Sequence, residues 1–500
     1  MTSPVVPSLQ PLPDLSLETA PAEPLTSSDS GGGLLEQLAL ALERQGIRYC
    51  QWKGHWSVHR WSRGYGDVDL LVDHAAQAEF RTIVGQLGFK LAHPAGERQI
   101  PGVEHYFGSD PLVPRLLHIH VHYRLLLGEY WNLVYRLPLE DQILEQSVPG
   151  NPFRVPSPTH TFLIFVFRMM LRQVGRPFLS VHARWLSGIQ VPLASLEAGS
   201  EAEELARLFK HLSPIDLRFF NRCVRSLEGR ASRVERFVLP WQLHLKLRSH
   251  VRRPSARSMV TAGIEKFLPP AISSRLADGR MHLSGGGLVL ALIGGEGSGK
   301  STCARELLRW LGPEFPTLRA NLGSPPKSLL TLAAEAALKV QGSIDRWLGR
   351  SPQRGGSLAL LRHLCIARDR YRLYQRVHRF ATSGGLALCE QYSIRQNYAH
   401  VGPCIPELLP GKAGWLADQF RRAEAFYYDR MIAPDALFVL KLDPELAVLR
   451  KPGEPADYVR ARGRNIWDTD WSTSPAHLVD AGRPLLEVLR QLKTIIWSIL

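Results

Sequence analysis

The 500-residue sequence predicts a multidomain α/β protein whose C-terminal part is a parallel sheet flanked by helices. From residue 288 onward, short apolar runs alternate with long segments of helical periodicity, as in parallel sheets covered by helices. A glycine-rich loop stands between the first apolar run and a helix. Hydrophobic residues make up 45% and charged residues 21% of the chain, which excludes a mostly disordered, collagen-like or coiled-coil protein.

The N-terminal segment predicts a disordered leader over residues 1–33, because it is rich in proline, serine and glycine. The first basic residue is Arg44, so we expect no secretory signal. The longest apolar run, 161–170, is interrupted by Arg168 and is shorter than the roughly 20 residues that span a bilayer, so we expect no membrane span. Six cysteines without a CxxC pair favour buried free thiols and a cytoplasmic protein.

Residues 34–150 predict an α+β domain in which helix and strand alternate. The apolar spacing is helical in 34–45, whereas 68–72 is a β-type run and 116–123 alternates strictly. A helical connector is expected over 151–251 and a linker over 252–285, ahead of a C-terminal domain at 286–500. The clearest helices of the connector are 162–171, 205–212 and 234–247, and the clearest C-terminal strands are 288–293, 386–389 and 437–442.

Much of the net charge of +15 lies in the connector. Between Arg207 and Arg257 there are 13 Lys+Arg and 3 Asp+Glu, a net charge of +10. We interpret this segment as an amphipathic helical layer with a solvated basic face. Because aromatic residues such as Phe219 and Trp241 are interleaved, an anionic partner at 207–257 is the alternative, namely RNA, DNA or anionic lipid.

The glycine-rich loop at 294–301, GGEGSGKS, matches the G-x-x-x-x-G-K-[ST] phosphate loop of P-loop nucleotide-binding proteins. It follows an apolar strand and opens the helix expected at 302–311, where glycines and the helix N-terminus favour phosphate. Lys300 can reach the β- and γ-phosphates and Ser301 can ligate Mg²⁺, so the predicted cofactors are ATP and Mg²⁺. The predicted cofactor-binding residues are Gly294, Gly295, Glu296, Gly297, Ser298, Gly299, Lys300, Ser301 and Thr302.

From residue 288 to the C-terminus the chain resembles the thymidylate kinase family of nucleoside monophosphate kinases. The loop with Glu296 at its third position, the helical Ala-Arg-Asp-Arg ending at Arg370, and the order of the later strands carry the resemblance. It implies ATP-dependent phosphoryl transfer to a nucleoside monophosphate or a related small acceptor, with Glu296 and Arg370 facing that acceptor. The resemblance is also compatible with a dimer.

Phosphoryl transfer needs cations around the migrating group in addition to Mg²⁺ and the loop lysine. Residues 295–298 supply none, whereas the position of the family's mobile lid carries three alternating arginines. A solvated loop is the alternative for that segment. Glu390, at a strand end, keeps a carboxylate that can act on Mg²⁺ or its waters. The predicted catalytic residues are Lys300, Glu390, Arg460, Arg462 and Arg464, and the predicted metal ligands in this domain are Ser301 and Glu390.

Two departures from the family pattern argue against thymidylate as the acceptor. The family's Asp-Arg-Tyr after the third strand is replaced by Glu390-Gln391-Tyr392, and Gln391 cannot supply the charge of a guanidinium. Residues 318–327 replace the family's early Arg-Glu-Pro-Gly-Gly segment. We therefore expect a kinase framework with an altered acceptor pocket.

A second candidate site lies in the N-terminal domain. Asp67 and Asp69 stand at i and i+2, hence on one strand face, and convergent carboxylates suit Mg²⁺ bound to nucleotide phosphates. With Lys53-Gly54 before them, they resemble an uncharacterised family of nucleotidyltransferase-fold proteins, which implies Asp67 and Asp69 as metal ligands. His120 stands where that resemblance expects a third carboxylate, and imidazole prefers softer metals than Mg²⁺.

Because of His120, more than one function is compatible with this domain. We expect a degenerate, binding-only domain, with active nucleotidyl transfer as the alternative. His118, His120 and His122 fall on one strand face, which suits either a half-exposed histidine stripe or a Zn²⁺ or Mn²⁺ site with the aspartates. For the whole chain, the expected function is an ATP/Mg²⁺-dependent kinase; the alternatives are a nucleotidyltransferase and a non-catalytic nucleotide-binding regulatory or scaffold protein.

Overall fold

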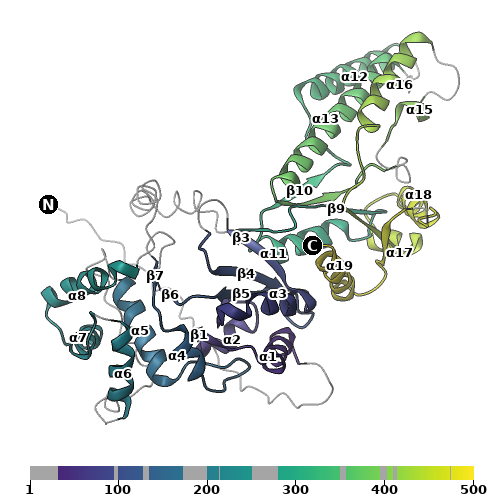
Figure 1. The fold of residues 1–500 in the computed structure, drawn as a ribbon. Helices are drawn as coiled ribbons and strands as arrows, with labels where there is room; N and C mark the ends of the chain where they lie inside the picture. Colours follow the sequence, from purple (N-terminus) through teal and green to yellow (C-terminus); the bar gives the residue numbers. More distant parts are fainter. Residues whose placement is uncertain are drawn as a thin grey trace, which may run out of the picture. The chain divides into compact units, whose positions relative to one another are not determined.

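A computed structural model describes residues 32–94, 99–127, 134–172, 200–212, 214–250, 280–349, 356–394, 402–408, 414–472 and 474–500. The expected leader up to residue 31 and the expected linker up to residue 279 lie outside these residues. The described chain is mixed α/β, with a mixed sheet in its N-terminal half and an all-parallel sheet in its C-terminal half (Figure 1). The predicted α/β class, with helices flanking a parallel sheet, is confirmed at this level.

The N-terminal sheet has the strand order β1-β2-β5-β4-β3-β8. Strands β2 and β5 run parallel, and the other neighbouring pairs run antiparallel. The edge strand β8 comes from the end of the expected linker, where three residues are too short to show a periodicity. The strands are β1 (Tyr49–Lys53), β2 (Asp67–Val72), β3 (Lys90–Pro94), β4 (Val103–Gly108), β5 (Leu117–His122) and β8 (Met281–Leu283), and a separate hairpin pairs β6 (Leu126–Leu127) with β7 (Tyr135–Arg136).

The two faces of this sheet differ in chemistry, because successive side chains of β2 and β5 point to opposite faces. One face buries apolar residues such as Leu70 and Ile119 against the helices α1 (Leu34–Arg44) and α3 (Gln77–Gln86). The other face carries Asp67 and Asp69 on β2 and three histidines on β5. This polar face holds the second candidate site.

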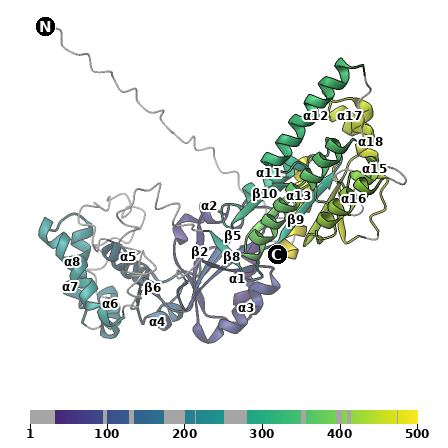
Figure 2. The same ribbon diagram turned by 90° about the horizontal axis from the view of Figure 1, so that it is seen from above.

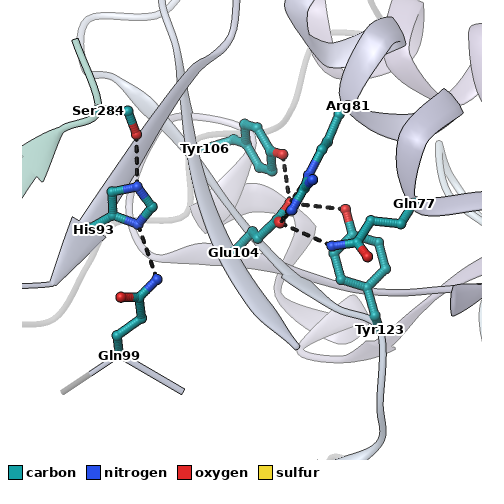
Figure 3. A network of polar contacts seen from close by, with 8 residues as sticks. All are labelled: Gln77, Arg81, His93, Gln99, Glu104, Tyr106, Tyr123 and Ser284. Carbon is teal, nitrogen blue, oxygen red and sulfur yellow. Dashed lines mark hydrogen bonds and ion pairs between the residues drawn. The ribbon is translucent and has the colours of Figure 1, made fainter. Parts of the chain in front are cut away.

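The half-buried carboxylate of Glu104 ties α3 to the N-terminal sheet (Figure 3). Glu104 on β4 accepts hydrogen bonds from Tyr106 Oη at 2.6 Å and Tyr123 Oη at 3.0 Å. From α3, Gln77 Nε2 donates at 3.2 Å and Arg81 Nε at 3.0 Å. Burial opposes ionisation, but the hydrogen bonds from Arg81 and the tyrosines prevail and lower the pKa of Glu104. The network is therefore a fully satisfied structural anchor.

The described residues of the connector form helices, and these helices share one hydrophobic core with Cys50, Trp52 and Leu71 of the N-terminal sheet. Phe219 and Phe220 are buried in that core, so two of the aromatic residues in the basic segment serve packing. Trp241 is 41% exposed, and residues 251–257 of the basic segment lie outside the described chain. Helix α4 (Glu140–Glu145) precedes the connector, whose described helices are α5 (Pro158–Arg172), α6 (Ser200–His211), α7 (Leu217–Leu227) and α8 (Arg233–Lys246).

The C-terminal sheet has the order β10-β11-β9-β12-β13, and all its neighbouring strands run parallel. Helices α11 and α19 pack on one face and α13 packs on the other, while α12 and α16 lie beside α13 (Figures 1 and 2). The strands are β9 (Val289–Gly294), β10 (Thr317–Asn321), β11 (Leu386–Glu390), β12 (Ala436–Lys441) and β13 (Ala476–Asp480). The helices are α11 (Lys300–Leu311), α12 (Leu329–Trp347), α13 (Ser357–Thr382), α15 (Ile405–Leu408), α16 (Trp415–Tyr428), α17 (Pro444–Arg450), α18 (Ala456–Trp467) and α19 (Leu485–Ile499).

Two further expectations concern the thiols and the membrane. All six cysteines are free, and five of them are buried while Cys404 is half-buried. Among the helices of the described residues, none has both the length and the apolar character to cross a bilayer.

Candidate functional site

The phosphate loop connects the end of β9 to the start of α11, as the sequence predicts. Gly297 and Gly299 have φ angles of +73° and +84°, which L-residues with a side chain rarely adopt. At Gly294, a Cβ atom would lie 2.6 Å from Ser298 Oγ and 2.9 Å from the Leu440 carbonyl oxygen. The loop conformation therefore requires glycine at these positions.

The side chains of Lys300 and Ser298 form hydrogen bonds with the backbone of the loop. Lys300 Nζ donates to the Gly295 carbonyl oxygen at 2.7 Å, and Ser298 Oγ donates to the same oxygen at 2.8 Å. Burial lowers the pKa of Lys300, an effect that the nearby Glu296 carboxylate opposes. The ammonium group thus lies at the loop, where the sequence pattern expects it to meet phosphate.

The loop lines a cavity of about 810 Å³. The α11 N-terminus, the ends of β10 and β11, and α18 contribute to its wall. The residues that line it are Glu296, Gly297, Ser298, Gly299, Lys300, Ser301, Thr302, Cys303, Asn321, Gly323, Ser324, Glu390, Gln391, Arg450, Lys451, Tyr458, Arg462, Ala481, Arg483, Leu485 and Val488. Most of the predicted cofactor-binding residues therefore surround one cavity; Gly294 and Gly295 shape the loop behind it.

Glu390 is a buried carboxylate at the end of β11, beside the loop. Its Oε2 accepts from Ser301 Oγ at 2.5 Å, and its Oε1 accepts from Arg319 Nε at 2.7 Å. The side chain of Glu390 is only 3% exposed, whereas that of Arg319 is 45% exposed. Two oxygen ligands of the kind that Mg²⁺ prefers, from Ser301 and Glu390, are thereby brought together as predicted.

The three predicted lid arginines lie on the helix α18 and do not act as one group. Arg462 lines the cavity, and its Nε lies 3.3 Å from Glu296 Oε1. Arg460 pairs with Glu445 at 2.6 Å and with Asp457 at 2.9 Å, away from the cavity lining. In a helix, residues two apart point in nearly opposite directions, whereas residues four apart share a face. Arg464 therefore lies on the side of Arg460, and it is likewise absent from the lining.

Helix α18 packs directly against the phosphate loop through a pair of glycines. A Cβ atom at Gly295 would lie 3.0 Å from Gly463 Cα and 3.3 Å from the Arg462 carbonyl oxygen. This close approach brings Arg462 to the cavity. Nothing in the local sequence around Gly463 reveals it, because the contact joins segments that are far apart in the chain.

Arg370 and Gln391 hold the other side of the cavity. Arg370 is buried and does not line the cavity; its Nε donates to the Leu322 carbonyl oxygen at 2.6 Å. Its position supports the segment after β10, which does line the cavity at Gly323 and Ser324. Gln391 lines the cavity with a φ angle of +56°, and its Nε2 donates to the Gly294 carbonyl oxygen at 3.3 Å. Among the described residues, it is the one non-glycine with positive φ.

Sequence reasoning missed several polar residues of the site. Arg319 and Asn321 lie on β10, next to β11, and their side chains meet Glu390 and the turn after β10. Asn321 Oδ1 accepts from the backbone N–H groups of Gly323 at 3.0 Å and Ser324 at 3.2 Å. A polar residue at the end of a strand beside the phosphate loop was the available signal.

The second candidate site lies on the polar face of the N-terminal sheet. As predicted, Asp67 and Asp69 share a strand face, but the side chain of Asp69 is 8% exposed while that of Asp67 is 45% exposed. Lys53 Nζ lies 2.7 Å and His120 Nδ1 3.1 Å from Asp69 Oδ1. Burial opposes ionisation of Asp69, but the Lys53 charge prevails and holds its pKa well below the usual range. Burial also lowers the pKa of His122 to about 3.

Comparison with known proteins finds no family model and no curated protein that matches this chain. The function must therefore be argued from the chemistry of the two sites.

Proposed function

We propose that the protein is an ATP- and Mg²⁺-dependent phosphotransferase that acts on a nucleoside monophosphate or a related small acceptor. One observation carries the proposal: the phosphate loop, Glu390 and Arg462 come from three separate segments and converge on one cavity. A glycine-rich turn with a solvated lysine would not require such convergence.

The cavity fits the phosphates of a nucleotide. Its volume of about 810 Å³ falls within the usual range for small-molecule sites, roughly 300–1,000 Å³. The glycines leave the backbone open where a Cβ atom would fill the loop, and the α11 N-terminus favours an anion. Lys300 adds a full positive charge at that point, so donor phosphates have both amides and a cation to bind.

The residues also fit a magnesium ion. Ser301 and Glu390 would hold Mg²⁺ or its waters, since hydroxyl and carboxylate oxygens are its preferred protein ligands. When bound, Mg²⁺ would offset part of the negative charge of the phosphates. Arg319 holds Glu390 by two nitrogens, at 2.7 and 2.6 Å, so the carboxylate is positioned before any ligand arrives.

Arg462 is the residue that we assign to the transferred phosphoryl group. Phosphoryl transfer depends on positioning and on cations around the migrating group. Arg462 lines the cavity from α18, which packs against the phosphate loop, and its guanidinium pairs with Glu296. Arg460 and Arg464 do not line the cavity, so neither is assigned to catalysis.

The acceptor side of the cavity is polar but carries little charge. Asn321, Ser324 and Gln391 contribute amide and hydroxyl groups there. We infer that the acceptor is recognised chiefly by hydrogen bonds, with Arg370 supporting the backbone behind it rather than contacting it.

The test is an ATP-consumption screen of the full-length protein over nucleoside monophosphates and sugars. The proposal predicts transfer to at least one acceptor, loss of transfer in Lys300→Ala, and retention in Asp67→Ala/Asp69→Ala. Binding of ATP without transfer to any acceptor would instead favour a non-catalytic nucleotide-binding protein. Loss of transfer in the aspartate variant alone would assign the chemistry to the N-terminal domain.

A further inference from the structure

A carboxylate and two imidazoles converge on the polar face of the N-terminal sheet, outside the phosphate-loop cavity. Asp69 on β2 and His120 on β5 are directly opposite each other in a parallel pair, and His122 follows two residues later. One ligand atom from each residue lies within 4.8 Å of the others. We propose that Asp69, His120 and His122 form a binding site for a divalent transition-metal ion of the zinc class.

The distances between the donor atoms suit such an ion. Asp69 Oδ1 lies 3.1 Å from His120 Nδ1 and 3.7 Å from His122 Nε2. Tetrahedral zinc with bonds of about 2.0–2.1 Å separates its ligand atoms by about 3.3 Å. The separations of 3.1 and 3.7 Å lie on either side of that spacing, and the strands hold all three side chains on one face.

The environment of His122 is independent evidence for a bound metal ion. It is only 4% exposed, and neither of its ring nitrogens has a hydrogen-bond partner among the described residues. The 3.7 Å separation from Asp69 is too long for a hydrogen bond. A buried imidazole with both nitrogens unpaired is unfavourable, and a metal bond to Nε2 would satisfy one of them. Trp52 contacts the ring edge-on, with a centroid separation of 5.0 Å.

The donor set selects the metal. Imidazole nitrogen suits zinc and other first-row transition metals, whereas Mg²⁺ and Ca²⁺ require oxygen ligands. Three protein ligands leave a fourth position open, the arrangement of catalytic rather than structural zinc sites. Asp67 lies next to these ligands and is accessible: its side chain is 45% exposed and its Oδ2 lies 3.9 Å from His120 Nδ1.

Lys53 provides the sharpest test, because it competes for the same oxygen. Its Nζ lies 2.7 Å from Asp69 Oδ1. An ammonium group and a metal ion compete for the negative charge of that oxygen, so Lys53 should weaken metal binding. Replacing Lys53 with an uncharged residue of similar length should therefore strengthen metal binding. A mere hydrogen-bond network would gain no metal affinity from this change.

His118 is a matched control on the same strand face. Its Nε2 lies within hydrogen-bond distance of His105 Nδ1, at 3.1 Å, so this pair satisfies itself. His118 does not belong to the group formed by Asp69, His120 and His122. A histidine-rich surface that binds metal without specificity would involve His118 as much as its neighbours.

The experiment titrates Zn²⁺ into metal-free, full-length protein without a histidine tag, by calorimetry, in a Glu390→Gln background that weakens metal binding at the phosphate loop. The expected result is one equivalent of bound Zn²⁺. His122→Asn should weaken binding by at least about tenfold, Lys53→Met should tighten it, and His118→Asn should leave it unchanged.

A second measurement is independent of whether the His122→Asn variant folds correctly. Co²⁺ bound to the protein that retains all three ligands should show the visible absorption of a four-coordinate ion, and Lys53→Met should reach that spectrum at lower Co²⁺ concentration. The proposal is overturned if Zn²⁺ does not bind, if Co²⁺ keeps the spectrum of the aquated ion, or if His118→Asn and His122→Asn weaken binding equally.

Discussion

The different positions of Arg460 and Arg462 give the most discriminating prediction about phosphoryl transfer. Arg462 lines the cavity beside Glu296, whereas Arg460 pairs with Glu445 and Asp457 on the outer side of the same helix. Arg462→Ala should therefore impair transfer, and Arg460→Ala should leave kcat within about twofold of the unaltered protein, since exposed ion pairs contribute little.

The size of the Arg462 effect follows from its charge and its partner. A unit charge about 4 Å from a phosphoryl oxygen is worth about 4 kcal/mol at the effective dielectric constant of a site near the protein surface. Glu296, 3.3 Å from the guanidinium, offsets part of that charge. If about two-thirds of the interaction remains, the loss is about 2.7 kcal/mol, or about 100-fold in kcat. Catalytic arginines in other phosphoryl-transfer enzymes contribute about 10³-fold or more.

The assay is steady-state ATP consumption with the best acceptor from the screen, using variants whose thermal unfolding matches the unaltered protein. We expect a loss in kcat with a smaller change in KM for ATP, because the charge of Arg462 acts mainly on the transferred group. Equal losses in the two variants, or a larger loss in Arg460→Ala, would refute the assignment of Arg462.

Three further predictions concern the phosphate loop, Glu104 and the connector. Gly295→Ala should push α18 from the loop, lower ATP affinity and cost about 1–3 kcal/mol of unfolding free energy by denaturant titration, whereas Gly342→Ala, which meets open space in α12, should cost nothing. Glu104→Gln should cost about 2 kcal/mol, because a charged acceptor of several hydrogen bonds is lost. Because the pKa of Glu104 is lowered in the folded state, ionised Glu104 stabilises the fold above pH 4.5, and this stabilisation is lost as the pH falls below that value. The Glu104→Gln variant should lack this part of the acid sensitivity of unfolding. An unchanged pH profile of stability in the variant would contradict the prediction. Phe220→Ala should destabilise the connector by about 3–5 kcal/mol, because the ring is fully buried against Phe162, Phe167 and Phe209; a stable variant would show that the basic segment lacks a packed core.

Much of the fold could be predicted because local patterns dictate it. Strict alternation located β5 and placed its histidines on one face, and the phosphate-loop pattern located the turn from β9 into α11. The edge strand β8 was missed, because three residues carry no readable period and the pairing with β3 depends on a distant segment.

Some residues of the site could be predicted from the sequence, but their arrangement could not. Glu390 could be identified from its place after an apolar strand, while its partner Arg319 depends on β10 lying beside β11. The three arginines look equivalent in sequence; only the helix α18 and the contact of Gly295 with Gly463 separate Arg462 from the others. Tertiary contacts of this kind have no local signature.

On the proposed function, the phosphate-loop cavity binds ATP together with Mg²⁺, and Lys300 contacts the phosphates. The most direct measurement is calorimetric titration of the full-length protein with ATP in the presence of Mg²⁺, comparing Lys300→Ala with Lys339→Ala, a control on the exposed side of α12. We predict one bound nucleotide per chain, at least about tenfold weaker binding in Lys300→Ala, and unchanged binding in the control. No ATP binding, or equal binding by Lys300→Ala and the unaltered protein, would contradict the account.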